Sequence, residues 1–568
     1  MTDKTDSTQK FVISDKIIVE KDVSIKMRDG ATLLADIFRP IDSDVSSVPA
    51  IINTSIYQKD KVWIPPADLE EKPNDYMNWE TVNPLWWVPK GYAIVRVDSR
   101  GAGKSSGRSE PNSYQEAVDF YDAIEWVASR SWCSGNVGTC GISYHANSQW
   151  RVAGLQPPSL KAIIPWEGRA DLYRDQAFHG GIFGLGFIAN WYSLHTAHHL
   201  LGEPQTYNAD AFDNNMLRDF MSHSLDSEFW RMRSARWENI VVPLYSAGNW
   251  SGFALHLRGN TEGYMLAASK NKKLRIHDGT HFHAFYSEEG RQDQLRFMDF
   301  WLKGIDNGIM DEPPIKLLIR TGDGLPYKWR FEHEWPLART EWTKMYLKID
   351  KETSDEDERV EGGLVLEPLN ECKKISYPAS GFAKAGVASA SSISHALGVQ
   401  HRTGVSFQTA PMLEDMEVTG PIVLKLWIAS SSCDMDIFAT IRNIGPDGVE
   451  RYEVGQAGQP VPVTKGWLRA SHRQLDSERS LPYRPYHTHT KRQWLTPSEP
   501  VCCEVEIWPT SMVFRKGHRL QLDIQPRDGA GSAPYTHYHA SYNTNAENMI
   551  YSGGEMQSYL LLPVIPAG

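Results

Sequence analysis

This chain of 568 residues lacks several sequence features, and each absence excludes a class of protein. No apolar run approaches the roughly 18 residues of a membrane span, and the first segment, MTDKTDSTQK, lacks the apolar core of a secretory signal. Long basic runs are also missing, and 59 Lys and Arg against 70 Asp and Glu give a net charge of −11. We therefore expect a cytoplasmic protein that binds neither membranes nor nucleic acid.

Cysteine is scarce as well. The six cysteines stand at 133, 140, 372, 433, 502 and 503, and they form no C-x-x-C pair. This number is too small for a disulfide framework in a chain of this length, so we expect reduced, mostly packed thiols. Internal repeats and low-complexity segments are not found either.

What the chain does have is the composition of a large folded protein. Hydrophobic residues make up 41% and aromatic residues 11%, with 20 Trp, which supports large buried cores. At about 150 residues per domain, the length predicts more than one folded unit.

Residues 1–312 alternate short apolar runs with helical patterns. A hairpin is predicted at VSIKMRDGATLLADIFRP, where Asp29-Gly30 separates two alternating runs. Buried strands are predicted at VPAIINTSIY, YAIVRVDSRG, NVGTCGIS, LKAIIPWEG, VVPLYSAGNW and KKLRIHDGTH, and a helix at YQEAVDFYDAIEWVASR. This alternation is typical of a parallel α/β sheet.

Two later stretches follow other patterns. Residues 170–240 are rich in aromatics and helical spacing, and we interpret them as a helical cap insert over the active edge of the sheet. Residues 313–568 contain short alternating runs such as PIVLKLWIA and DIFATIRNI, which predict an all-β sandwich or jelly roll. The expected division is an α/β domain at 1–169 and 241–312, the insert at 170–240 and the β domain at 313–568.

The most informative segment for function is NVGTCGISYHANSQW, residues 136–150. A strand that runs through Gly141 into Ser143 and then into a helix is typical of a nucleophile elbow, a strained turn that lifts the serine hydroxyl above the sheet. The second glycine of the common form G-x-S-x-G is replaced here by His145.

The chain as a whole resembles the CocE/NonD hydrolases, which are cocaine-esterase-like relatives of α-amino-acid ester hydrolases and X-Pro dipeptidyl peptidases. The likeness lies in the elbow GISYHANSQW and, in the same order along the chain, in MRDGATLLADIFRP, VDSRGAGKSSG, DFYDAIEWVASRSWCSGNVG, LEDMEVTGPIVLKLWIASSSCDMDIFATI and GWLRASHR. The resemblance implies an α/β-hydrolase domain with a helical cap, followed by a jelly-roll, galactose-binding-like domain. It also implies a serine esterase or amidase that needs no cofactor.

The resemblance gives roles to individual residues. Ser143 would be the nucleophile, and His281, in HDGTH after the last predicted strand of the α/β domain, would remove its proton. Tyr57, at the end of IINTSIY, would donate its hydroxyl to the oxyanion, together with the main-chain amide of Tyr144.

The acid of the triad departs from the family pattern. Relatives carry Gly-Trp-x-Asp after the penultimate strand, and Ser251 stands at the aspartate position in AGNWSGF. Glu167 follows the strand LKAIIPW, whose carboxyl end faces the same edge of the sheet, so it could reach Nδ1 of His281. Asn249 could instead orient the ring as a neutral acceptor. We favour Glu167 and keep Asn249, or no third member, as alternatives.

Other candidates surround these residues. Trp166, His145 and Phe282 lie beside the predicted catalytic residues in the chain, and we expect them to contact a small, partly hydrophobic substrate. A metal is not expected, because His195 and His199 in HTAHH have helical spacing but no third ligand is apparent.

The predicted function is cleavage of an ester or amide through an acyl-serine intermediate. Two alternatives stay open: acyl transfer by the same Ser-His pair, and a non-hydrolytic or binding protein that has lost the usual aspartate. The natural substrate, its stereochemistry and the oligomeric state, including a homo-oligomer, are also open.

Overall fold

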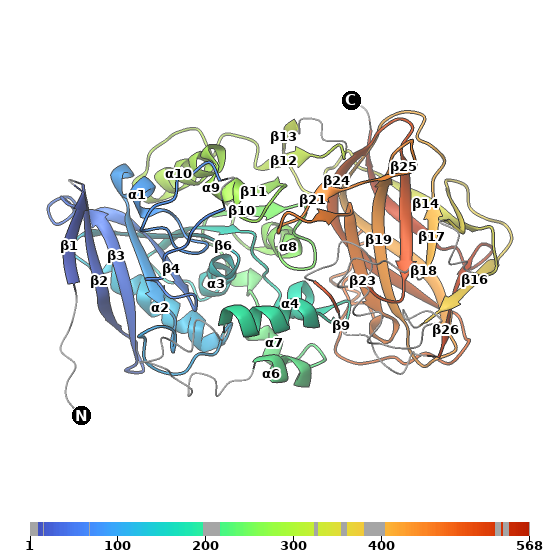
Figure 1. Cartoon of the computed structure of the whole chain (residues 1–568), viewed down its shortest axis with the longest axis horizontal. Helices are drawn as coiled ribbons and strands as arrows, with labels where there is room; N and C mark the ends of the chain where they lie inside the picture. The colour runs from blue at the N-terminus through green and yellow to red at the C-terminus, as the bar shows by residue number, and fades with distance from the viewer. Residues whose placement is uncertain are drawn as a thin grey trace.

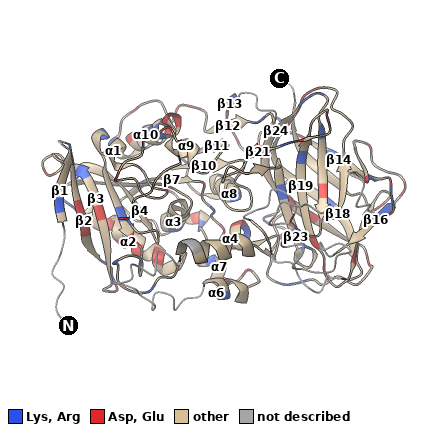
Figure 2. Cartoon of the chain, viewed as in Figure 1, with Lys and Arg blue, Asp and Glu red and all other residues tan. Residues whose placement is uncertain are grey.

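The computed structural model describes residues 9–14, 16–66, 69–196, 216–322, 328–353, 360–379, 404–528, 535–537 and 545–566. Figure 1 shows two halves side by side: an N-terminal half in which helices cover a sheet, and a C-terminal half built mainly of strands. Acidic and basic residues are interspersed over both halves (Figure 2). Within the described ranges, no helix is both long enough and apolar enough to cross a membrane.

An eleven-stranded sheet forms the centre of the N-terminal half. Its middle strands run parallel in the order β5-β4-β6-β7-β10-β11-β12, while β1-β2-β3 and β13 add antiparallel edges. The strands are β1 (Gln9–Ser14), β2 (Ile17–Lys26), β3 (Thr32–Pro40), β4 (Val48–Ser55), β5 (Ala93–Asp98), β6 (Cys133–Ile142), β7 (Leu160–Trp166), β10 (Leu244–Asn249), β11 (Lys272–His277), β12 (Ile315–Ile319) and β13 (Lys328–Glu332).

The predicted parallel sheet is confirmed, and its sequence explains why. Every residue of β5 and β10 is buried, as expected for continuous apolar runs in strands covered on both faces. The predicted hairpin is also present as β2–β3, with Gly30 at φ 91° in the left-handed region that its turn requires.

Helices cover both faces of this sheet. The longest described are α2 (Tyr114–Ala128) and α10 (Glu288–Lys303), each capped by a serine hydroxyl that accepts a main-chain N–H. The others are α1 (Pro84–Trp87), α3 (Tyr144–Ala153), α8 (Leu257–Leu266) and α9 (His283–Tyr286), with a short 3₁₀ turn at Val88–Lys90.

The region predicted as a cap contains short elements in its described parts. They are α4 (Leu185–Asn190), α6 (Met216–Ser222), α7 (Glu228–Arg231), the hairpin β8–β9 (Phe178–His179 and Ile182–Phe183), π-helical turns at Tyr173–Ala177 and Trp191–Thr196, and a 3₁₀ turn at Trp237–Asn239. Figure 1 places α4, α6 and α7 near the junction of the two halves. The exact domain boundaries stay a prediction, and β12 and β13 continue the first sheet beyond residue 312.

The C-terminal half is rich in β-structure, as predicted. Its main sheet closes on itself, because β18 pairs with β24 on one side and with β27 on the other. The jelly-roll order of strands stays a prediction. The strands are β14 (Glu341–Ile349), β15 (Gly362–Val365), β16 (Lys373–Pro378), β17 (Val405–Gln408), β18 (Met416–Ser430), β19 (Asp436–Ile444), β20 (Glu450–Arg451), β21 (Glu453–Val454), β22 (Pro460–Val461), β23 (Thr464–Arg469), β24 (Val501–Phe514), β25 (Arg519–Gln525), β26 (Glu547–Ser552) and β27 (Tyr559–Ile565), with a 3₁₀ turn at Ala470–His472.

The topology brings several polar residues to one edge of the first sheet. Parallel strands end at the same edge, so the residues that follow β6, β7, β10 and β11 meet there. Ser143 follows β6, Glu167 follows β7, Asn249 ends β10 and His281 comes shortly after β11.

Candidate active site

Ser143 occupies a strained turn between β6 and α3. Its φ and ψ of 55° and −111° lie outside the regions that non-glycine residues favour, as a nucleophile elbow requires. Main-chain hydrogen bonds on both sides hold this backbone: the N–H of Ser143 donates to the carbonyl of Trp166 at 3.0 Å, and its carbonyl accepts from the N–H of Asn147 at 2.8 Å. The turn therefore fixes the serine at the carboxyl edge of the sheet.

Glu167 is fully buried, and its carboxylate accepts N–H groups from four side chains. Nδ1 of His281 lies 2.6 Å from Oε2, and Nε2 of His277 lies 2.9 Å from Oε1. Asn249 donates to Oε1 at 3.1 Å, and Gln456 donates to Oε2. Burial alone would raise the pKa of Glu167, but His281 and His277 hold it below its usual range, so the carboxylate is ionised.

His281 lies between two carboxylates. Its Nε2 is 3.2 Å from Oε1 of Glu80, while its Nδ1 faces Glu167. Burial opposes the charged ring, yet the two carboxylates raise the pKa of His281 to about 10. At neutral pH this ring is therefore an imidazolium.

A second histidine, His256, is the hydrogen-bond partner of the serine. Oγ of Ser143 lies 3.2 Å from Nε2 of His256, whose ring stacks on that of His281 at 5.4 Å between centroids and 9° between planes. Burial, with the charge on His281, lowers the pKa of His256 well below its usual value, so this ring is neutral. The structure thus brings Ser143 close to the His281–Glu167 pair, with His256 as the direct contact.

Three residues of the site, His256, Glu80 and Gln456, were not predicted from the sequence. The only signal for His256 is its position a few residues after β10, which ends at the active edge. Glu80 and Gln456 lie outside any motif, and the latter comes from the C-terminal half, between β21 and β22.

The structure also describes Ser251, which stands at the aspartate position, and Asn249, the predicted alternative to Glu167. Ser251, at the aspartate position, donates its hydroxyl to Oδ1 of Asp278 at 2.6 Å. The side-chain amide of Asn249 donates to Glu167 and, at 2.9 Å, to the carbonyl of Gly279. Asn249 therefore supports the carboxylate, and the residue bonded to Nδ1 of His281 is Glu167.

The two residues predicted to bind the oxyanion lie beside each other. The rings of Tyr57 and Tyr144 are 5.7 Å apart, and the hydroxyl of Tyr57 accepts from the indole N–H of Trp191 at 2.9 Å. The hydroxyl of Tyr144 instead donates to Glu116 at 2.7 Å, so its main-chain amide, and not its hydroxyl, stays the predicted oxyanion donor. Burial raises the pKa of Glu80 above its usual value, and hydrogen bonds from His281 and from the main-chain amide of Tyr144 oppose this only in part.

The predicted substrate contacts differ in accessibility. The ring of Trp166 is fully buried against His277, at 5.2 Å between centroids. His145 is also buried, 6.1 Å from the ring of Tyr57, and burial lowers its pKa to about 3, so it is neutral. Phe282 is partly exposed and lies 5.0 Å from the ring of His281. Of these three side chains, only that of Phe282 is exposed to solvent beside the histidine rings.

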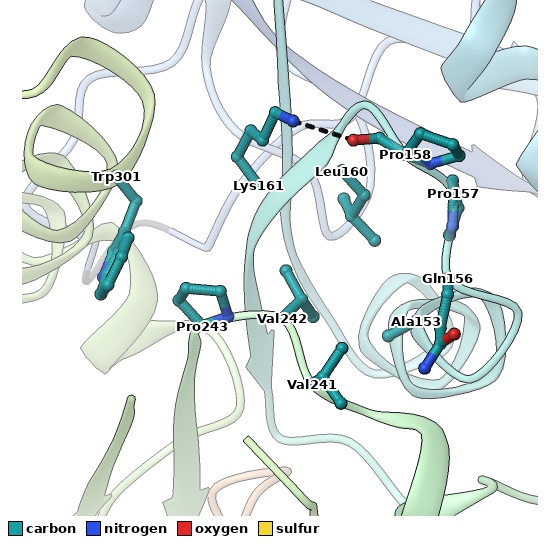
Figure 3. Close-up of a pocket in the computed structure, with 10 residues that line it drawn as sticks. All are labelled: Ala153, Gln156, Pro157, Pro158, Leu160, Lys161, Val241, Val242, Pro243 and Trp301. Carbon is teal, nitrogen blue, oxygen red and sulfur yellow. Dashed lines mark hydrogen bonds between the residues drawn. The ribbon is translucent and has the colours of Figure 1, made fainter. Parts of the chain in front are cut away.

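A separate cavity of about 420 Å³ lies away from this site (Figure 3). It opens at the beginnings of β7 and β10, whereas Ser143 and Glu167 stand at the other end of the sheet. Its walls are largely apolar side chains and prolines: Ala153, Gln156, Pro157, Pro158, Leu160, Lys161, Val241, Val242, Pro243 and Trp301. It has no nucleophile or acid–base pair among these lining residues.

One group of side chains has the composition of a metal site. Glu167, His256 and His281 each offer a ligand atom, and these atoms lie within 4.8 Å of one another. The amide nitrogen of Gln456 lies among them, 3.3 Å from Nδ1 of His256 and 3.4 Å from Nδ1 of His281. A cation there would have to displace this amide and the proton on His281. The side chains of His195 and His199 lie outside the described residues.

Comparisons with known proteins bear on the family and the fold. Residues 29–283 match the X-Pro dipeptidyl-peptidase (S15) family, and residues 307–561 match the X-Pro dipeptidyl-peptidase C-terminal non-catalytic domain. A CocE/NonD family hydrolase from Staphylococcus aureus is 31% identical, with a TM-score of 0.84 over 97% of this chain and 94% of that one. Cocaine esterase from a Rhodococcus species is 24% identical over 96% of this chain and 98% of its own length. An α-amino acid ester hydrolase, 17% identical with a TM-score of 0.71, shares the fold.

Proposed function

The chain belongs to the CocE/NonD family of hydrolases, and from that premise we propose that it cleaves an ester or amide bond through an acyl-serine intermediate on Ser143. The observation that carries the proposal is the strained elbow of Ser143 beside the His281–Glu167 pair, whose Nδ1–Oε2 distance is 2.6 Å. Such a serine and a histidine held by a buried carboxylate are the parts that acyl transfer needs.

In the proposed reaction, the neutral form of His281, which is the minor form at neutral pH, accepts the hydroxyl proton at Nε2 while Oγ of Ser143 attacks the carbonyl carbon. Glu167 holds the ring by Nδ1 and stabilises the imidazolium that forms. The negative charge on the carbonyl oxygen is bound by the hydroxyl of Tyr57 and the amide of Tyr144. His281 then protonates the leaving group, and water releases the acyl group by the same steps in reverse.

This sequence requires Nε2 of His281 to leave Glu80 and face the serine, and it requires the main-chain amide of Tyr144 to exchange Glu80 for the carbonyl oxygen of the substrate. The neutral ring of His256 remains against Oγ of Ser143 and orients it. The aromatic surface of Phe282 next to His281 supports a substrate that is small and partly hydrophobic. Relatives named as a cocaine esterase and as X-Pro dipeptidyl-peptidases indicate that both esters and amides belong in the substrate panel.

The direct test is to remove the proposed nucleophile. We expect Ser143→Ala to lower kcat/KM for activated esters by at least about 1000-fold, because the covalent step is lost. A fluorophosphonate should label the wild-type protein at Ser143, located by peptide mass spectrometry, and should not label the variant. Labelling at another serine, or unchanged turnover in Ser143→Ala, would refute the proposal.

The two histidines are separated by a second pair of variants. His281→Gln should lose nearly as much activity as Ser143→Ala, because the base and its link to Glu167 disappear together. His256→Gln keeps an N–H donor near the serine and should lose much less. The reverse order would make His256 the base.

A further inference from the structure

Gln456 joins the C-terminal half to a cluster formed by Glu167, His256 and His281. It lies in the turn between β21 and β22 and is 7% exposed. Its main-chain carbonyl accepts the N–H of His281 at 3.0 Å, while its side chain lies among Glu167, His256 and His281. The turn itself is closed by a hydrogen bond of 2.7 Å from Gly455 N–H to the carbonyl of Gln459. A rigid hairpin thus carries one amide into the site.

The orientation of this amide is fixed from both sides. The hydroxyl of Tyr535 donates to Oε1 of Gln456 at 2.9 Å, and Nε2 donates to the carboxylate of Glu167. A flipped amide would put its carbonyl oxygen against the carboxylate oxygen, which is repulsive. Nε2 therefore faces the two histidine rings as a donor.

The amide group has two N–H bonds, and their acceptors follow from the neighbours. Glu167 accepts one of them, and it also accepts Nδ1–H of His281, so that ring nitrogen is itself a donor. Nδ1 of His256, 3.3 Å from Nε2 of Gln456, is left as the acceptor of the second N–H. A neutral His256 carries one ring proton, which must then be on Nε2, facing Oγ of Ser143.

From this arrangement we infer that Gln456 is a positioning residue, because its amide fixes the Nε2–H tautomer of His256. In this tautomer His256 cannot accept the proton of Ser143 at Nε2, so His281 is left as the base. The inference rests on the proposed hydrolysis for its kinetic consequence. Without the amide, Nδ1 of His256 is free to carry the proton, and Nε2 then becomes a competing acceptor for the hydroxyl of Ser143. A serine that donates its hydroxyl proton to His256 is not available to donate it to His281.

The first test reads the tautomer directly and does not need activity. In protein labelled with ¹⁵N-histidine, the two ring nitrogens of His256, assigned by their loss in His256→Gln, should show a proton on Nε2. In Gln456→Leu the proton should move to Nδ1 in a substantial fraction of molecules. A wild-type proton on Nδ1, or an unchanged pattern in Gln456→Leu, would overturn the inference. If instead Ser143→Ala stays active, the proposed function fails while this readout still stands.

The second test is kinetic. Gln456→Leu should lower kcat about 10-fold to 100-fold with little change in KM, the size typical of groups that orient a reacting residue. Tyr535→Phe should lower kcat less, and it should add nothing in the Gln456→Leu background, because it acts through the same amide. Gln459→Leu, in the same turn but outside the cluster, is the matched control and should keep both kcat and the tautomer. An equal loss of kcat in this control would mean that the turn, not the amide, is responsible, and would overturn the inference.

Discussion

At the scale of single residues, the unusual feature is that the proposed base, His281, lies between the carboxylates of Glu80 and Glu167. The two carboxylates raise the pKa of His281 to about 10 against the effect of burial, so most molecules carry the charged ring at neutral pH. A charged ring has no lone pair for the serine proton. The neutral fraction grows as the pH rises toward 10, and we expect kcat/KM to rise with it over the same range.

Glu80 is the carboxylate that the mechanism does not use, and it is therefore the one to remove. Glu80→Gln takes away one of the two charges that stabilise the imidazolium, so the rising limb of the kcat/KM profile should move to lower pH. Measuring kcat/KM for one ester from pH 6 to 10.5 checks this shift. Glu71→Gln is the matched control: Glu71 is also a buried glutamate, but its partners are Asn83 and Arg291. If the rising limb moves equally in both variants, or in neither, it does not report the deprotonation of His281.

At the scale of elements, the elbow depends on how closely β6 and α3 approach. A Cβ on Gly141 would lie 2.7 Å from Cβ of His145 and 3.1 Å from the carbonyl oxygen of Glu80. Neither atom is the end of a flexible side chain, so the turn itself must move. Gly141→Ala should cost about 1–3 kcal/mol of folding free energy, the usual effect of overpacking, and should also reduce fluorophosphonate labelling at Ser143.

Urea unfolding measures the first effect. Gly363→Ala in β15 is the comparison, since a Cβ there meets its first neighbour at 3.8 Å, an ordinary contact, and it should change stability far less. Equal losses in the two variants would mean that replacing any strand glycine is enough, and that the crowding at the elbow has no special weight.

The elements also show what a sequence can and cannot predict. The strands around the site were predictable because their apolar runs are buried on both faces, and the turn at Ser143 was predictable because Gly141 and the serine form a local pattern. Glu167 could be proposed because parallel strands end at one edge. His256 and Gln456 could not, because neither ends a strand or belongs to a motif: His256 precedes α8, and Gln456 lies in a turn of the other half, and both reach the site only through packing. Such contacts depend on how whole elements pack, which local periodicity does not encode.

At the scale of the whole molecule, buried charges join the two halves. Arg258 of α8 is buried and pairs with Asp175 at 3.0 Å and with Glu506 of β24 at 2.9 Å. Burial opposes the charge on this guanidinium, but Glu506 and other nearby carboxylates raise its pKa well above the usual value. The arginine therefore stays charged and holds a carboxylate from each half. Gln456 also crosses between the halves, through the hydrogen bond of its amide to Glu167.

Removing this arginine should weaken both stability and catalysis. Arg258→Met leaves the buried carboxylate of Asp175 and the partly buried carboxylate of Glu506 without their cation, and breaking a buried pair typically costs about 3–5 kcal/mol. Urea unfolding followed by tryptophan fluorescence measures the loss, with Arg231→Met as the control, since the pair of Arg231 and Glu228 is exposed. Because Gln456 reaches the site only while the halves are docked, kcat should fall at urea concentrations below the main unfolding transition in Arg258→Met. If activity and the fluorescence signal of the folded protein are instead lost at the same urea concentration, and the unfolding midpoint equals that of the wild type, the buried pair does not couple the halves.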